Sequence, residues 1–146
     1  MTLHPCPAIV IDTNVVLDWL LFADPSVARL AAAVESRRVR WIATAEMRGE
    51  LAEVLRRGLA EARGVDEQPA LAAFDALATL LAAPVSIPLS MRLACTDPDD
   101  QKFLDLAHFS GARWLLSRDR AILKLARRAA RCGLTISTPE RWLPSE

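Results

Sequence analysis

Four acidic side chains in this sequence have the type and placement that cation-assisted chemistry requires: Asp12, Glu50, Asp100 and Asp119. Carboxylates that converge on one point are suited to a hard divalent cation such as Mg²⁺ or Mn²⁺. A cation held in this way lowers the pKa of a bound water, orients a phosphodiester and stabilises the charge that develops during in-line displacement. The set therefore predicts phosphodiester hydrolysis with one or two metal ions, provided that the fold brings the four residues together.

Short apolar segments alternate with longer segments of helical character along the chain. The strands expected are residues 8–11, 39–43, 85–87, 114–117 and 134–137. The helices expected are residues 25–36, 45–59, 69–81, 98–110 and 120–132, with Gly58, Gly111 and Gly133 where C-terminal caps belong. This alternation predicts an α/β fold, a three-layer α/β/α sandwich with a mostly parallel five-stranded sheet, in a single domain of residues 1–146.

The four acids occupy related places in this alternation. Asp12 ends the first strand, and Glu50 lies on the helix after the second. Asp100 opens the helix before the fourth strand, and Asp119 follows that strand. Because ligands bind beyond the carboxyl ends of parallel strands, we expect the four side chains to meet at one edge of the sheet.

Asp100 has the most informative surroundings of the four. In TDPDDQKFLDLA, Asp97 is expected to cap the helix and Pro98 to occupy its first position. Asp100 then falls in the middle of the apolar stripe of this helix, whereas Asp99 and Asp105 point elsewhere. A charge on a packed face needs a partner such as a cation, because an unpaired buried charge is costly. The crowding leaves open whether Asp97 or Asp99 takes the role given to Asp100.

Glu50 lies at the border of an apolar stripe, whereas Glu46 and Glu53 on the same helix point outward. Taken singly, the acids also have ordinary explanations as a helix cap, a partner of a helix dipole or a turn residue. Their convergence at one sheet edge favours a shared site over these separate roles.

Composition restricts the function classes. The 146 residues contain 18 basic and 18 acidic side chains, so no global positive field points to a polyanion, and contacts with phosphate must come from local groups such as Arg120. Three widely spaced cysteines without a CxxC pattern predict neither a disulfide framework nor a thiolate zinc site, and a reducing cytoplasm fits best. The sequence has no charged leader followed by a long apolar segment, so neither secretion nor membrane insertion is expected.

Three segments carry a family resemblance: IVIDTNVVLDWL, GELAEVL and TDPDDQKFLDLAHFSGARWLLSRD. In these segments the sequence resembles the PIN-domain ribonucleases, especially the VapC-like toxins of bacterial toxin-antitoxin systems. The resemblance implies that Asp12, Glu50, Asp100 and Asp119 are the metal-binding and catalytic acids. It also implies that Asn14 and Ser117 orient the ligands or the substrate.

The resemblance further implies an RNA substrate, dependence on Mg²⁺ or Mn²⁺, a homodimer and a small antitoxin protein as partner. The alternative is a catalytically silent PIN-like module that only binds RNA or a protein. An aspartate-nucleophile phosphatase would need an acid at Asn14, and a signalling receiver would need an aspartate after the third strand, where residues 87–90 offer none. Of the four tryptophans, Trp41 and Trp114 fall in expected strands and are predicted to be core residues rather than base-stacking platforms.

Overall fold

Five parallel strands form one sheet in the computed structural model, which describes residues 6–61, 67–85, 87–88 and 92–144. The strands are β1 (Ala8–Ile11), β2 (Arg40–Ala43), β3 (Thr79–Leu80), β4 (Trp114–Leu116) and β5 (Thr135–Ser137). Their order across the sheet is β3-β2-β1-β4-β5, so β1 and β4 are central. All residues of β1 and β4 are buried, as expected for continuous apolar strands covered on both faces.

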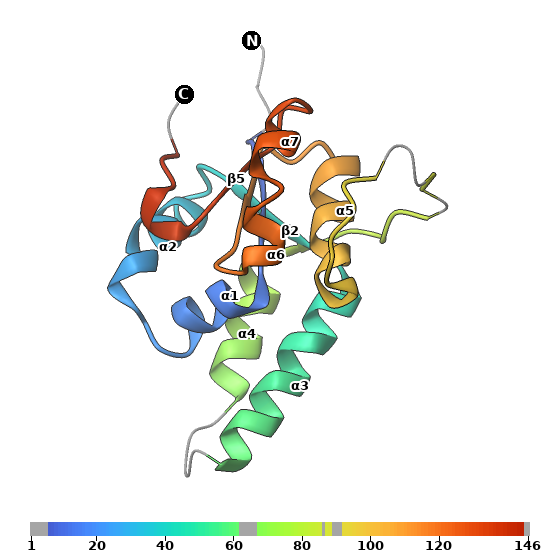
Figure 1. Cartoon of the computed structure of the whole chain (residues 1–146). Coiled ribbons are helices and arrows are strands. Elements are labelled where there is room, and N and C mark those ends of the chain that lie inside the picture. The colour runs from blue at the N-terminus through green and yellow to red at the C-terminus, as the bar shows by residue number, and fades with distance from the viewer. Residues whose placement is uncertain (1–5, 62–66, 86, 89–91, 145–146) are drawn as a thin grey trace.

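Helices cover both faces of this sheet, and Figure 1 shows α2 and α5 on opposite sides of it. The α-helices are α1 (Thr13–Leu20), α2 (Ala28–Glu35), α3 (Ala45–Glu61), α4 (Gln68–Leu77), α5 (Gln101–Phe109), α6 (Arg120–Leu123) and α7 (Ala126–Ala130). The 3₁₀ turns are η1 (Pro25–Val27), η3 (Pro98–Asp100) and η4 (Pro139–Arg141). The predicted α/β fold with a five-stranded parallel sheet is confirmed.

The third strand lies earlier in the chain than predicted. Residues 85 and 87 are in neither a helix nor a strand, whereas Thr79–Leu80 pairs with β2 at the edge of the sheet. The run LATLLAA is apolar apart from Thr79, so its hydrophobic pattern does not distinguish the end of a helix from a short strand. As a result the helix predicted for residues 69–81 ends at Leu77 instead.

Helix α1 was not predicted, although it directly follows the first candidate acid. It has only eight residues, and its buried side chains include Val15, Val16 and Trp19, two of which are β-branched and favour strands. Tertiary packing of this buried face therefore outweighs local preference. The helix predicted for residues 120–132 is divided into α6 and α7, because the amide of Leu125 donates to the Ile122 carbonyl in a tighter i to i+3 turn.

Two of the three glycine caps are confirmed. Gly111 and Gly133 follow α5 and α7 with φ of 73° and 82°, the left-handed conformation that ends many helices. Gly58 instead lies inside α3, so its predicted role as a cap is wrong. After α2 the left-handed position is occupied by Arg37, at φ 63°, where a side chain introduces backbone strain.

Replacing Arg37 with glycine is therefore expected to stabilise the protein. Relief of the left-handed strain should contribute roughly 1 kcal/mol to the free energy of unfolding, measured by urea denaturation. Arg38→Gly is the matched control, because Arg38 is also exposed and its φ is not positive. Equal or lower stability of Arg37→Gly compared with the wild type would contradict this interpretation.

The core contains all four tryptophans, with Trp41 and Trp142 each 1% exposed and Trp114 5%. Trp41 packs against Trp19 and Phe74, and Trp114 packs edge-on against Trp142. The prediction that Trp41 and Trp114 are core residues is confirmed, and none of the four is exposed for base stacking. No helix in the described ranges is long and apolar enough to cross a membrane.

Candidate active site

The site begins where the two central strands end. Ile11 of β1 is in register with Leu116 of β4, so the residues that follow, Asp12 and Ser117, are neighbours at the carboxyl edge. The Asp12 amide donates to the Leu116 carbonyl at 2.9 Å, which fixes this junction. The fully buried Ser117 hydroxyl donates to Oδ2 of Asp12 at 2.7 Å. The chain reverses direction across the sheet between β1 and β4, and this is the place where α/β proteins bind ligands.

Asp119 is held at the same edge by two hydrogen bonds. Its amide donates to the Ser117 hydroxyl oxygen at 2.9 Å, and its Oδ1 accepts from the Ala121 amide at 2.8 Å as the N-cap of α6. The capping explanation of Asp119 is therefore correct, but it uses only one of its two carboxylate oxygens. Ser117 connects Asp12 to Asp119 because its hydroxyl both donates and accepts.

The third part of the site is the turn that starts α5. Asp97 accepts from the Asp99 amide at 3.0 Å and caps η3, with Pro98 in the first position, as the sequence predicts. Asp100 is 9% exposed and its carboxylate makes no capping hydrogen bond, whereas Asp99 is exposed. Burial of Asp100 on the packed side of this helix is confirmed.

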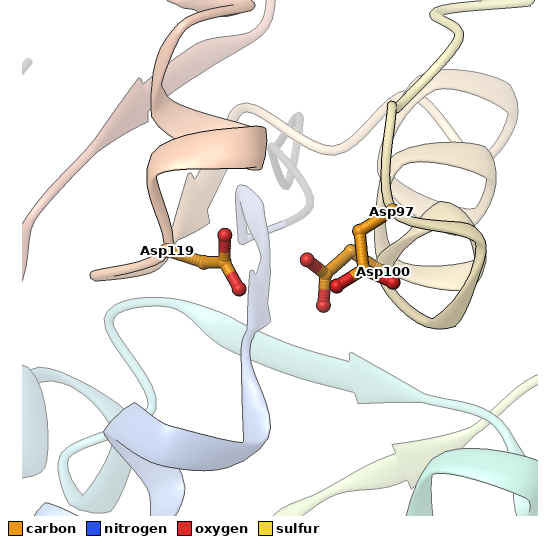
Figure 2. Close-up of side chains that lie close together, drawn as sticks. All are labelled: Asp97, Asp100 and Asp119. Carbon is orange, nitrogen blue, oxygen red and sulfur yellow. The ribbon is translucent and has the colours of Figure 1, made fainter.

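Asp97, Asp100 and Asp119 converge on one point. One oxygen from each lies within 4.8 Å of those of the other two, and Figure 2 shows Asp97 and Asp100 facing Asp119 across the space beside β1. Burial, the adjacent Asp119 carboxylate and the negative charge of Asp12 raise the pKa of Asp100 to about 7. Its buried Oδ2 has no hydrogen-bond partner within the described part of the chain. Such a carboxylate is unfavourable without a positive partner.

Asp12 shares this electrostatic environment although it is not one of these three. Burial raises its pKa, the Ser117 hydroxyl opposes that shift, and the charges of Asp119 and Glu50 raise the pKa further. Asp12 occupies the N-cap position of α1, yet its side chain makes no capping hydrogen bond. Its carboxylate instead accepts from the backbone of Thr13, the first residue of α1, a contact that lowers the pKa of Asp12.

Glu50 reaches the same region from α3 but is engaged by other side chains. The Thr13 hydroxyl donates to its Oε2 at 2.7 Å, and the Lys102 ammonium forms an ion pair with its Oε1. The Glu50 side chain is 31% exposed, consistent with a position at the border of the apolar stripe, and Glu46 and Glu53 are exposed as predicted. Glu50 is therefore beside the compact group of three acids and not part of it.

The remaining candidates lie around these acids. Asn14 is exposed in the first turn of α1, and Arg120 is exposed at the start of α6, directly after Asp119. Two residues in the site were not singled out from the sequence: Thr13 and Lys102, both of which hold Glu50. No local pattern indicates either one, since their contacts join elements far apart in the chain. Asp97 was left open as an alternative ligand and faces the same point as Asp100.

The donor set fits a hard divalent cation. The converging atoms are carboxylate oxygens, and the unpartnered Oδ2 of Asp100 is a buried acceptor beside them. The Cys95 thiol lies close to these acids. Burial and the charges of Asp100 and Asp97 raise its pKa, and this effect exceeds the opposing effect of a backbone hydrogen bond. A thiol kept neutral in this way does not favour a soft-metal site.

The fold and site together define an α/β protein with an acidic centre at the switch point of a parallel sheet. Comparison with protein families matches residues 8–121 to the PIN domain, and the chain belongs to this family. PIN domains are generally metal-dependent nucleases that bind divalent cations, so the fold is a nuclease fold. A search of curated proteins found no match.

Proposed function

We propose that this chain is a metal-dependent endoribonuclease, with Asp12, Glu50, Asp100 and Asp119 as its metal-binding and catalytic acids. The observation that carries the proposal is the state of Asp100, a buried carboxyl pressed against Asp119 with one oxygen unpartnered. A divalent cation would supply the missing partner. Asp97 joins the proposed ligand set because its carboxylate faces the same point.

One or two Mg²⁺ or Mn²⁺ ions would lower the pKa of a bound water. They would also stabilise the negative charge that develops on the phosphate during cleavage. The residues of the chain then have separate tasks. Ser117 fixes the orientation of Asp12, and the amide of Ala121 fixes that of Asp119. Asn14, exposed in the first turn of α1 two residues after Asp12, is proposed to contact the substrate.

A segment with several exposed basic side chains directly follows Asp119 in the chain and supports a polyanionic substrate. The segment 120–139 contains no acidic residue, while its exposed basic residues are Arg120, Lys124, Arg127, Arg128 and Arg131. Ile122 of α6 and Ala129 of α7 are buried, so the opposite faces of these helices, which carry basic side chains, are exposed. This segment begins at Arg120, next to Asp119, so Arg120 is the basic residue proposed to contact a substrate phosphate near the acids.

Arg120→Ala is therefore expected to weaken RNA binding without impairing the chemical step. KM should rise several-fold with kcat nearly unchanged, and the slope of log Kd against log salt should fall by about 1. Arg38→Ala is the control, because Arg38 precedes β2 and lies at the opposite edge of the sheet. An equal effect of both variants would assign the loss to general charge and not to this position.

Binding of the divalent cation is expected to depend on pH. The pKa of Asp100 is raised to about 7, so a proton occupies this carboxyl below neutrality and must leave before a cation binds. Mn²⁺ affinity should therefore rise with pH and level off above about 7.5, falling up to about tenfold per pH unit below 7. Calorimetric titrations between pH 5.5 and 8.5 measure this, and a flat profile would contradict it.

Cleavage of labelled RNAs tests the proposal itself. Wild-type protein with Mn²⁺ or Mg²⁺ should cut single-stranded or structured RNA internally, and EDTA or Asp100→Asn should stop it. Metal binding without cleavage of any RNA in a broad set would favour the catalytically silent module. Absence of both would overturn the assignment of the acids.

The role of toxin in a toxin-antitoxin pair, with a small antitoxin partner and a homodimeric state, is part of the same proposal and rests on the family resemblance. Expression of the chain in bacteria should arrest growth, and the Asp100→Asn variant should not. Light scattering of the purified protein measures the dimer. Normal growth with active, folded wild-type protein would separate the nuclease from the toxin role.

A further inference from the structure

Lys102 is the second residue of α5, the helix that directly follows the η3 turn containing Asp100. Its ammonium pairs with Glu50 Oε1 and donates to the Asp99 carbonyl at 2.5 Å. It also lies 5.1 Å from the centre of the Phe103 ring. These contacts tie α3 to the start of α5 through one side chain that is only 16% exposed.

The pairing is selective among the candidate acids. Within the described part of the chain, Glu50 forms an ion pair, whereas Asp12, Asp100 and Asp119 form none. The other basic residues that pair with acids do so elsewhere, as Arg92 does with Asp105. Among the described residues, Lys102 is therefore the basic side chain that forms an ion pair with one of the four candidate acids.

Space next to Lys102 allows its side chain to move. A pocket of about 100 Å³ adjoins it, lined by Thr44, Glu46, Ala83, Pro84, Lys102 and Asp105. The exposed Glu46 carboxylate in this pocket offers a second anionic partner on the same helix as Glu50. If Lys102 released Glu50, its ammonium would still have a polar environment in this pocket.

We propose that Lys102 is an internal counterion that holds Glu50 in the metal-free chain and competes with the divalent cation for the Glu50 carboxylate. This rests on the proposed metal-binding role of Glu50. The Lys102 ammonium is paired with a Glu50 oxygen that would also bind the divalent cation. The two positive charges therefore compete for the same carboxylate. Lys102 then acts through Glu50 as a positioning residue, which sets the metal concentration at which the site fills.

The test is Mn²⁺ affinity of the whole chain without RNA, measured by calorimetry or by the electron paramagnetic resonance signal of free Mn²⁺. Lys102→Met should bind Mn²⁺ roughly tenfold more tightly than the wild type, because a competing charge is removed. Lys102→Arg keeps the charge and should stay within about twofold of the wild type. If Lys102→Met does not fold, Lys102→Gln makes the same comparison.

A double-mutant cycle distinguishes action through Glu50 from a general charge effect. In the Glu50→Gln background, Lys102→Met should change Mn²⁺ affinity by about twofold or less, because the shared carboxylate is gone. An undiminished gain in that background would overturn the proposal, and so would unchanged or weaker binding by the single variant. Failure of the wild type to bind Mn²⁺ would overturn both this proposal and the proposed function, whereas normal wild-type binding with no effect of Lys102→Met overturns this proposal alone.

Discussion

Replacing Asp100 with asparagine should make the metal-free protein more stable while removing its response to divalent cations. In the wild type, the folded state raises the pKa of Asp100 from 3.8 to about 7, so burial and repulsion disfavour its charged form. Asparagine carries no charge, and its amide can donate to the neighbouring carboxylates. At pH 8 the melting temperature should rise by several degrees, since 1 kcal/mol corresponds to about 2–4 °C for a chain of this size.

This gain should depend on pH in a defined direction. Between about pH 4 and 7 the folded wild type binds a proton at Asp100 that the unfolded chain has released, so its stability falls as pH rises through this interval. The advantage of Asp100→Asn should therefore be largest above pH 7 and disappear near pH 4. Melting curves over this range, with and without Mn²⁺, measure both effects.

Asp99→Asn is the control for charge removal, because Asp99 precedes Asp100 but is exposed. It should leave both the metal-free stability and the Mn²⁺-induced shift nearly unchanged. If Asp100→Asn were less stable than the wild type at pH 8, or kept the full Mn²⁺ shift, the unpartnered carboxylate would not be the cation ligand.

Asp12→Asn should reduce RNA cleavage more than any substitution that merely supports a ligand. A supporting residue typically contributes about 10- to 100-fold, and the loss in kcat/KM for Asp12→Asn should exceed about 100-fold. Ser117→Ala should fall within the smaller range, because it removes the hydroxyl that orients Asp12 and opposes the rise in its pKa. Initial rates with a labelled RNA at saturating Mn²⁺ give the comparison.

Ser137→Ala provides the matched control at the end of the neighbouring strand. The Ser137 hydroxyl donates to the Thr138 carbonyl and contacts none of the four acids through a described hydrogen bond. Its removal should change cleavage by less than about threefold, because this half-buried local hydrogen bond is made within one turn of chain and not to the acids. Similar losses for Ser117→Ala and Ser137→Ala would point to general loosening of the sheet edge.

The parts of the fold that could be predicted from the sequence are those where local pattern and burial agree. β1 and β4 are continuous apolar runs that end at a polar residue, so both the strands and the position of Asp12 followed directly. Asp97 and Pro98 are helix-start signals, and they placed Asp100 on the buried side of the turn into α5. These two successes explain why Asp12 and Asp100 could be nominated together.

The errors arose where tertiary packing decides between local alternatives. The two-residue strand β3 exists because its backbone pairs with β2, a long-range interaction that the apolar run containing Leu80 does not encode. Helix α1 forms from β-branched residues that favour strands locally, because its buried face packs in the core. Asp105 was expected to lie off the apolar stripe of its helix, which is wrong, because it is buried and paired with Arg92, 13 positions earlier in the chain.

The arrangement of the site residues was harder to predict than their identity. Sequence position indicated that Glu50 and Asp119 approach the same edge, but not that Glu50 is held by Thr13 and Lys102 apart from the compact group. The inclusion of Asp97 could not be decided, because one residue of shift along a turn rotates a side chain by about 100°. Such details depend on side-chain contacts between distant segments.

The most direct test of the central claim is the anomalous scattering of Mn²⁺ in crystals of this protein grown or soaked with that ion. We expect an anomalous peak at the carboxyl edge of the sheet, bound by oxygens of Asp100 and Asp119 with Asp97 or Asp12 beside them. The same peak should be absent in Asp100→Asn crystals. Well-ordered carboxylates without a peak at millimolar Mn²⁺, or a peak bound only by acids elsewhere on the chain, would contradict the assignment of this site as a metal-dependent nuclease centre.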